Sequence, residues 1–174
     1  MSEEIYSENE LIKWYMNNIR KGAKEEKVDN LWAQILSFYW PTREKYGVER
    51  ETHIAKHSQM RANVILTKIK DDKLKRCLYV ECKRPTKSIS IEPTKTEWEN
   101  AIEQLQGYID KGKRHNLGPN LYAIVGIGVM VRFFVLHAGQ KSLQTYGGTA
   151  SLSIKKDHME VHRILTEIRQ RLTL

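Results

Sequence analysis

Hydrophobic positions recur along the chain with two different periods, and the change of period separates predicted helices from predicted strands. Apolar side chains at three- and four-residue spacing predict helices over 8–19, 23–39, 97–110 and 157–172. Denser apolar runs predict strands over 62–69, 76–83, 121–125 and 130–136, and a weaker pattern predicts one over 51–59. After two leading helices the expected order is three strands, a helix, two strands and a helix. This order predicts an α/β fold with a mixed sheet flanked by helices.

Local signals mark where several of these elements begin and end. Ser7 with Glu10 is the expected capping box of the first helix, and Pro41 ends the second. A polar turn over 70–73 joins two strands into a predicted β-hairpin. Asp157 is the expected N-cap of the last helix. Neither a repeat nor a long linker interrupts the pattern, so we predict a single domain over 1–174.

Composition narrows the class of protein only slightly. The 174 residues are 40% hydrophobic, which suits one globular domain. No apolar run approaches the ~20 residues that cross a bilayer, and the first residues lack the layout of a secretory signal. We therefore expect an intracellular protein, cytoplasmic or nuclear. Cys77 and Cys82 have no zinc-site spacing and are expected to be reduced strand cysteines.

The charge balance favours a polyanionic partner. Lys and Arg number 29 against 21 Asp and Glu, a formal net charge of +8, and cationic side chains gain affinity by releasing counterions from phosphates. A basic protein that is merely soluble has the same balance, so charge alone does not decide. The candidate nucleic-acid contacts are the cations at the predicted hairpin turn and those that follow its second strand: Lys73, Lys75, Arg76, Arg84 and Lys87.

The segment Tyr79-Val-Glu-Cys-Lys-Arg-Pro85 carries the strongest chemical signal. Alternate residues of a strand share a face, so Glu81 and Lys83 should project together and Cys82 away from them. A carboxylate can bind a hard divalent cation, while a neighbouring ammonium orients water and offsets charge on a phosphate. A Glu-x-Lys strand is usually a solvated ion pair. Here its place at the end of an apolar strand, before an amphipathic helix, favours a functional site.

This arrangement resembles the PD-(D/E)XK nuclease superfamily, whose restriction-endonuclease-like members share a mixed sheet flanked by helices. Glu81 and Lys83 match the family's (D/E)-x-K pair, and Gln104, followed by Tyr108, matches its helix glutamine. For the family's leading-helix glutamate we favour Glu25 over Glu26, although both are also ordinary first-turn carboxylates. The resemblance implies a Mg²⁺ or Mn²⁺ site formed by Glu81, Glu25, the main-chain carbonyl near Cys82 and the residue at the hairpin aspartate position.

At that position the sequence departs from the family. Arg61-Ala-Asn-Val-Ile-Leu66 places Asn63 where the family has its aspartate. An amide oxygen can bind a metal, but it brings no negative charge, so metal binding should be weakened. Asp71 and Asp72 fall at the hairpin tip and are poor substitutes. An altered but active site, a natural binding module and a deliberately neutralised acid all fit the substitution.

The resemblance therefore implies a metal-dependent nuclease acting on DNA, with RNA also open. In this scheme Glu81, Lys83, Gln104 and Asn63 are the catalytic residues, and a water activated by the metal hydrolyses a phosphodiester. The alternatives are a catalytically silent nucleic-acid-binding module and a protein-interaction module on the same fold. The sequence leaves open whether the chain forms a homodimer.

Overall fold

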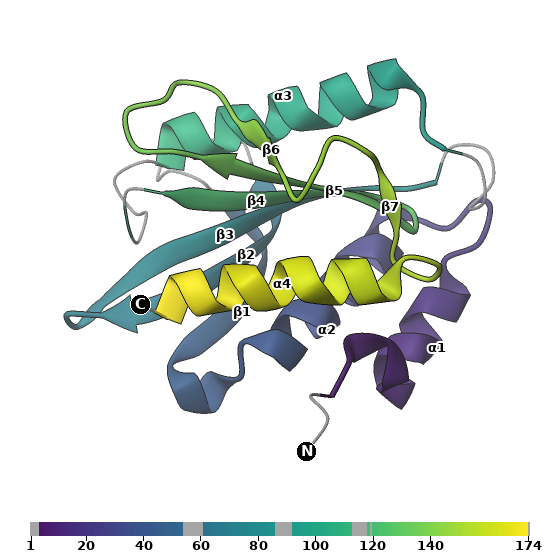
Figure 1. Ribbon diagram of the computed structural model, residues 1–174, viewed down its shortest axis with the longest axis horizontal. Helices are drawn as coiled ribbons and strands as arrows, with labels where there is room; N and C mark the ends of the chain where they lie inside the picture. The colour runs from purple at the N-terminus through teal and green to yellow at the C-terminus, as the bar shows by residue number, and fades with distance from the viewer. Residues whose placement is uncertain (1–3, 54–60, 86–91, 113–117, 119, 174) are drawn as a thin grey trace.

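The protein is a mixed α/β structure in which one sheet is flanked by helices, as the sequence predicted (Figure 1). The computed structural model describes residues 4–53, 61–85, 92–112, 118 and 120–173. Its helices are α1 (Glu10–Asn18), α2 (Glu25–Tyr39), α3 (Lys95–Gly112) and α4 (His158–Thr173), with short 3₁₀ turns η1 (Tyr6–Glu8) and η2 (Thr42–Glu44). Its strands are β1 (Tyr46–His53), β2 (Arg61–Lys70), β3 (Lys73–Lys83), β4 (Leu121–Ile127), β5 (Met130–Leu136), β6 (Gln144–Tyr146) and β7 (Leu152–Ser153).

The strand order places β3 and β4 in the middle of the sheet. The order is β1-β2-β3-β4-β5-β6, with β7 also paired to β5. Strands β2 and β3 form the predicted antiparallel hairpin, whose two turn residues, Asp71 and Asp72, both have positive φ, as a type I′ turn requires. Strands β3 and β4 are parallel, and α3 provides the crossover between them.

Two hydrophobic clusters, one on each face of the sheet, explain why the central strands are nearly continuous apolar runs. On one face Val80 and Cys82 of β3 pack with residues of α1, α2 and α4. On the other face Tyr79 packs with Trp98, Leu105 and other residues of α3. All seven residues of β4 are buried, as expected for a strand covered on both faces. No helix in the described part of the chain is long and apolar enough to span a membrane.

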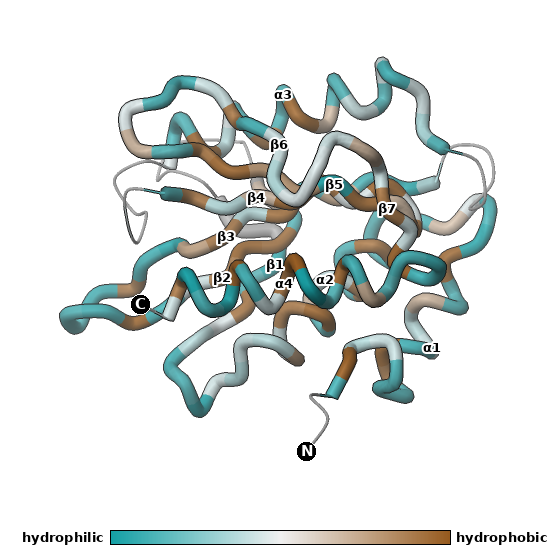
Figure 2. The backbone as a smooth tube through the Cα atoms, in the orientation of Figure 1, coloured by the Kyte–Doolittle hydropathy of each residue, from teal (hydrophilic) through white to brown (hydrophobic). Residues whose placement is uncertain are grey.

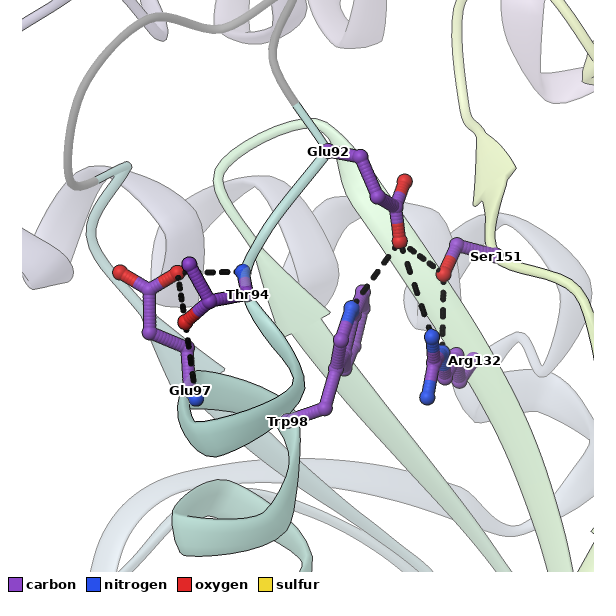
Figure 3. A network of polar contacts seen from close by, with 6 residues as sticks. All are labelled: Glu92, Thr94, Glu97, Trp98, Arg132 and Ser151. Atoms are coloured by element: carbon purple, nitrogen blue, oxygen red, sulfur yellow. Dashed lines mark hydrogen bonds and ion pairs between the residues drawn. The ribbon is translucent and has the colours of Figure 1, made fainter.

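Several predicted element boundaries were wrong. Ser7 does not cap the first helix, because it lies within the η1 turn; the Asn9 side chain instead accepts from the backbone N–H of Ile12. The weakly predicted strand over 51–59 lies earlier in the chain, from Tyr46 to His53, and residues 54–59 are outside the described residues. Helix α3 begins earlier than predicted because Thr94 and Glu97 form a capping box (Figure 3).

A polar network attaches the start of α3 to β5 (Figure 3). Glu92 accepts hydrogen bonds from the Trp98 indole, at 3.0 Å, and from the Ser151 hydroxyl, and it lies 3.7 Å from an Arg132 nitrogen. Arg132 also donates to Ser151 at 2.8 Å, and its guanidinium lies 4.4 Å from the Trp98 ring centroid. The network therefore holds Glu92 and the first turns of α3 against β5.

We expect Arg132→Met to lower the free energy of unfolding by about 1 kcal/mol, because it removes a cation–π contact and a charge-assisted hydrogen bond while keeping the aliphatic stem. Urea denaturation measures this change. Arg163→Met is the matched control, because Arg163 pairs with Glu160 and Glu167 on the exposed side of α4, where ion pairs contribute little. An equal loss in both variants would show that the network adds no stability beyond that of a surface pair.

Candidate functional site

The candidate site lies where β3 ends. Glu81 is fully buried, whereas the Lys83 side chain is 29% exposed, and the Lys83 Nζ lies 2.6 Å from Glu81 Oε1. As the alternation of a strand predicts, both side chains project to the same face and the intervening Cys82 packs into the opposite cluster. The backbone carbonyl of Lys83 accepts from the N–H of Gly128, which fixes the strand end against the β4–β5 turn.

Asn63 connects the strand pair to the first turn of α2. Its Oδ1 accepts from the backbone N–H of Cys82 at 3.0 Å, and its Nδ2 donates to Glu25 Oε1 at 3.2 Å. The other Glu25 oxygen lies 3.8 Å from the Lys83 Nζ. The structure therefore brings Glu25, Asn63, Glu81 and Lys83 together, although they come from three elements separated along the chain.

Helix α3 supplies the opposite wall of the site. The side chain of Tyr108, which is largely buried, lies near Glu81; burial first, and then the charge of the neighbouring Glu81, raise the pKa of Tyr108 to about 12. One turn earlier on the helix, Gln104 is exposed. It lines a pocket of about 270 Å³ together with Glu25, Lys83 and Arg84.

Burial dominates the electrostatics of Glu81. Loss of solvent raises its pKa to about 7; the ion pair and hydrogen bond with Lys83 act in the opposite direction, and the carboxylates of Glu25 and Asp29 add to the increase. A carboxyl group with this pKa exchanges a proton near neutral pH, which is common at functional sites and rare for a surface glutamate.

Asp29 of α2 is a further carboxylate near the site that was not predicted, and its side chain is buried, with an exposed fraction of 3%. Asp29 lies four residues after Glu25 on α2, so the two carboxylates share a helix face. It forms a hydrogen bond with the Cys82 thiol, and burial followed by the charges of Asp29 and Glu81 raises the pKa of that thiol well above its usual range. Its position among the buried apolar residues of α2 is the sequence signal that could have identified it.

The predicted nucleic-acid contacts do not form one group. Arg84 is exposed at the mouth of the pocket, and Lys87 is outside the described residues. Lys73, Lys75 and Arg76 lie at the other end of β3; Lys73 and Glu81 are eight positions apart along the strand, a distance of roughly 26 Å. Arg76 is also separated from the two lysines, because its guanidinium contacts Tyr79 on the α3 face.

The side chains present do not match a tight divalent-metal site. Mg²⁺ and Mn²⁺ require several oxygen ligands with negative charge among them. The Asn63 oxygen already accepts a backbone hydrogen bond, Lys83 contacts the Glu81 carboxylate, and Asp29 faces the thiol on the other side of β3. Within the described ranges, no group of three or more His, Cys, Asp or Glu residues could hold a metal ion. Lys83 is instead the cation that this cluster contains.

Comparisons with protein-family models, with curated proteins and with solved structures find no match for this chain.

Proposed function

We propose that the chain is a nucleic-acid-binding protein of the PD-(D/E)XK type, with a restriction-endonuclease-like fold, in which Asn63 has weakened the nuclease site. DNA is the favoured partner, and RNA is the alternative. The observation that carries the proposal is the cluster at the end of β3. The Lys83 Nζ and Glu81 Oε1 are 2.6 Å apart there, Tyr108 lies near the same carboxylate, and Asn63 joins the cluster where an aspartate would complete a metal site.

The pocket beside this cluster supports the binding function. Its cations are Arg84 and Lys83, which also pairs with Glu81, and its carboxylates are Glu25 and Glu97. Asn100 and Gln104 add amides that can donate and accept hydrogen bonds. Phosphate oxygens bind such cations, and amides pair with sugar or base edges. The groups of the pocket therefore suit a nucleotide unit better than an apolar ligand.

A metal-dependent nuclease, using Mg²⁺ or Mn²⁺, is the second candidate. The elevated pKa of Glu81 favours the nuclease, because a buried carboxylate is costly to ionise and a bound cation or a proton would lower that cost. What opposes it is charge: an amide at position 63 leaves one negative charge fewer than the family pattern requires.

The binding proposal is tested by titrating a short labelled DNA duplex at several salt concentrations. We expect affinity to fall steeply between ~50 and ~200 mM salt, as it does when several phosphates are contacted. Arg84→Glu should weaken binding about tenfold and reduce the salt slope by ~1.

Arg43→Glu is the control with the same change of charge. Arg43 is exposed in η2, beyond the far end of α2 from Glu25, so it should change the affinity much less. Equal weakening by both substitutions would mean that only net charge matters, and salt-insensitive or undetectable binding to both DNA and RNA would contradict the proposal.

A further inference from the structure

The end of the β2–β3 hairpin has a distribution of charge that the fold itself does not favour. The register places Lys70 opposite Lys73 and Lys68 opposite Lys75. Residues directly opposite in an antiparallel pair have Cβ atoms about 5 Å apart, and like charges there are destabilising. Two such pairs in succession put four ammonium groups on one face of a two-stranded arm.

The four lysines share the face of the hairpin that adjoins α4. The Lys68 Nζ donates to the backbone carbonyl of Leu172, near the end of α4, and lies 4.8 Å from the ring centroid of Tyr46. Lys70 follows two residues later on the same strand, and Lys73 and Lys75 are the cross-strand partners. We name Lys68, Lys70, Lys73 and Lys75 the lysine face.

The lysine face projects from the body of the sheet. The pairing of β1 with β2 ends at Lys68, and β4 pairs with β3 only from Leu78 onward. In Figure 1 the hairpin extends past the neighbouring strands, and in Figure 2 its end is hydrophilic while the centre of the sheet is hydrophobic. Within the described part of the chain, no carboxylate forms an ion pair with Lys70, Lys73 or Lys75.

We propose that the lysine face is a second nucleic-acid contact, separate from the pocket beside Lys83, and that it binds the phosphate backbone. The two pairs are about 7 Å apart along the strands, from a rise of ~3.3 Å per residue. Repulsion between the opposed ammonium groups is relieved when phosphates lie between them. The pocket opens on the α3 side of the sheet at the opposite end of β3, so the two surfaces do not share residues.

A lipid surface is a poorer partner for this arm. The exposed apolar pair of the hairpin, Ile69 and Leu74, is 49% and 54% exposed, but it lies on the face opposite the lysines. Membrane-surface elements present apolar groups and cations to the same interface.

The test relies on the expectation that the opposed lysines lower stability while they favour binding. Lys73→Glu, made in the full chain, replaces a repulsive pair with an attractive one opposite Lys70. We expect it to raise the melting temperature by about 1–2 °C while it weakens binding of a short DNA duplex about tenfold and lowers the salt slope by ~1. Lys70→Glu should have the same two effects. A substitution that merely disturbed the fold would lower the melting temperature and would not raise it.

Lys13→Glu is the control, because Lys13 is exposed on α1, well away from the hairpin (Figure 1). It should leave both the affinity and the melting temperature nearly unchanged. Hairpin variants that bind the duplex as well as the parent, or no worse than Lys13→Glu, would overturn the inference. The inference would also be overturned if the hairpin variants lost binding to anionic phospholipid vesicles but not to DNA. This inference rests on the proposed nucleic-acid binding. If Arg84→Glu weakens DNA binding and the hairpin variants do not, the lysine face is not a contact but the pocket still is. If the hairpin variants weaken binding and Arg84→Glu does not, the pocket is not a contact.

Discussion

Replacing Asn63 with Asp should create metal-dependent cleavage of DNA, or raise it by at least tenfold, with Mn²⁺ more effective than Mg²⁺. The exchange is isosteric, so the carboxylate can still accept the hydrogen bond from the Cys82 N–H. It adds the negative charge that the cluster of Glu25, Glu81 and Lys83 lacks for a divalent cation. Mg²⁺ demands stricter octahedral geometry, which is the reason for the expected order. Nicking of a supercoiled plasmid measures the activity.

The same exchange should weaken the metal-free fold by about 1–2 kcal/mol. The Asn63 amide donates to Glu25 Oε1 at 3.2 Å, and a carboxylate in its place repels Glu25 instead. Added Mn²⁺ should then restore the melting temperature of Asn63→Asp and leave that of the parent unchanged, because a ligand stabilises only the form that binds it.

Two double variants provide the controls. Asn63→Asp combined with Glu81→Ala, or with Lys83→Ala, should lose the activity gained, whereas Asn63→Ala should gain none. If the folded Asn63→Asp protein bound DNA but showed neither an Mn²⁺-dependent thermal shift nor cleavage, the cluster would not be a nuclease site. The proposal of nucleic-acid binding would then remain without a nuclease site.

The second large effect concerns Glu81 and pH. The pKa of Glu81 in the folded chain is about 7, above its ordinary value of 4.5. Between these values the folded state holds a proton that the unfolded state has released, so the contribution of this group to stability falls as pH rises from ~4.5 to ~7 and is fully lost above that. Ionising Glu81 in the fold therefore costs up to about 3 kcal/mol at alkaline pH.

Glu81→Gln should accordingly raise the free energy of unfolding by about 1–3 kcal/mol at pH 8 and change it little at pH 4. The lower part of this range allows for the Lys83 ammonium, which loses its closest carboxylate. Urea denaturation across this pH range measures the effect, and Glu103→Gln, exposed on α3, is the control. A variant less stable than the parent at pH 8 would show that the Glu81–Lys83 pair stabilises the fold.

The sequence by itself determined the α/β class, the central hairpin and the common face of Glu81 and Lys83. These follow from short-range rules. The period of apolar residues distinguishes helix from strand, and the alternation of a strand assigns its faces without knowledge of the neighbours. The N-cap of the first helix was harder to predict, because Ser7 and Asn9 are both suitable N-cap residues. Asn9 is the cap because the η1 turn includes Ser7.

Only the tertiary structure decided which distant residues surround Glu81. The Asp29 carboxylate acts on Glu81 through its charge from the α2 side of the sheet, and Tyr108 lies near Glu81 on the α3 side. The pKa of Glu81 depends on that packing, because desolvation is a property of the surroundings and not of the residue. The tertiary structure also separated the cations that the sequence placed together. The register of β2 and β3 shifts between Leu66 and Thr67. Beyond the shift, Arg76 lies opposite Thr67, whereas Lys73 and Lys75 lie opposite other lysines. No local sequence pattern specifies such a shift.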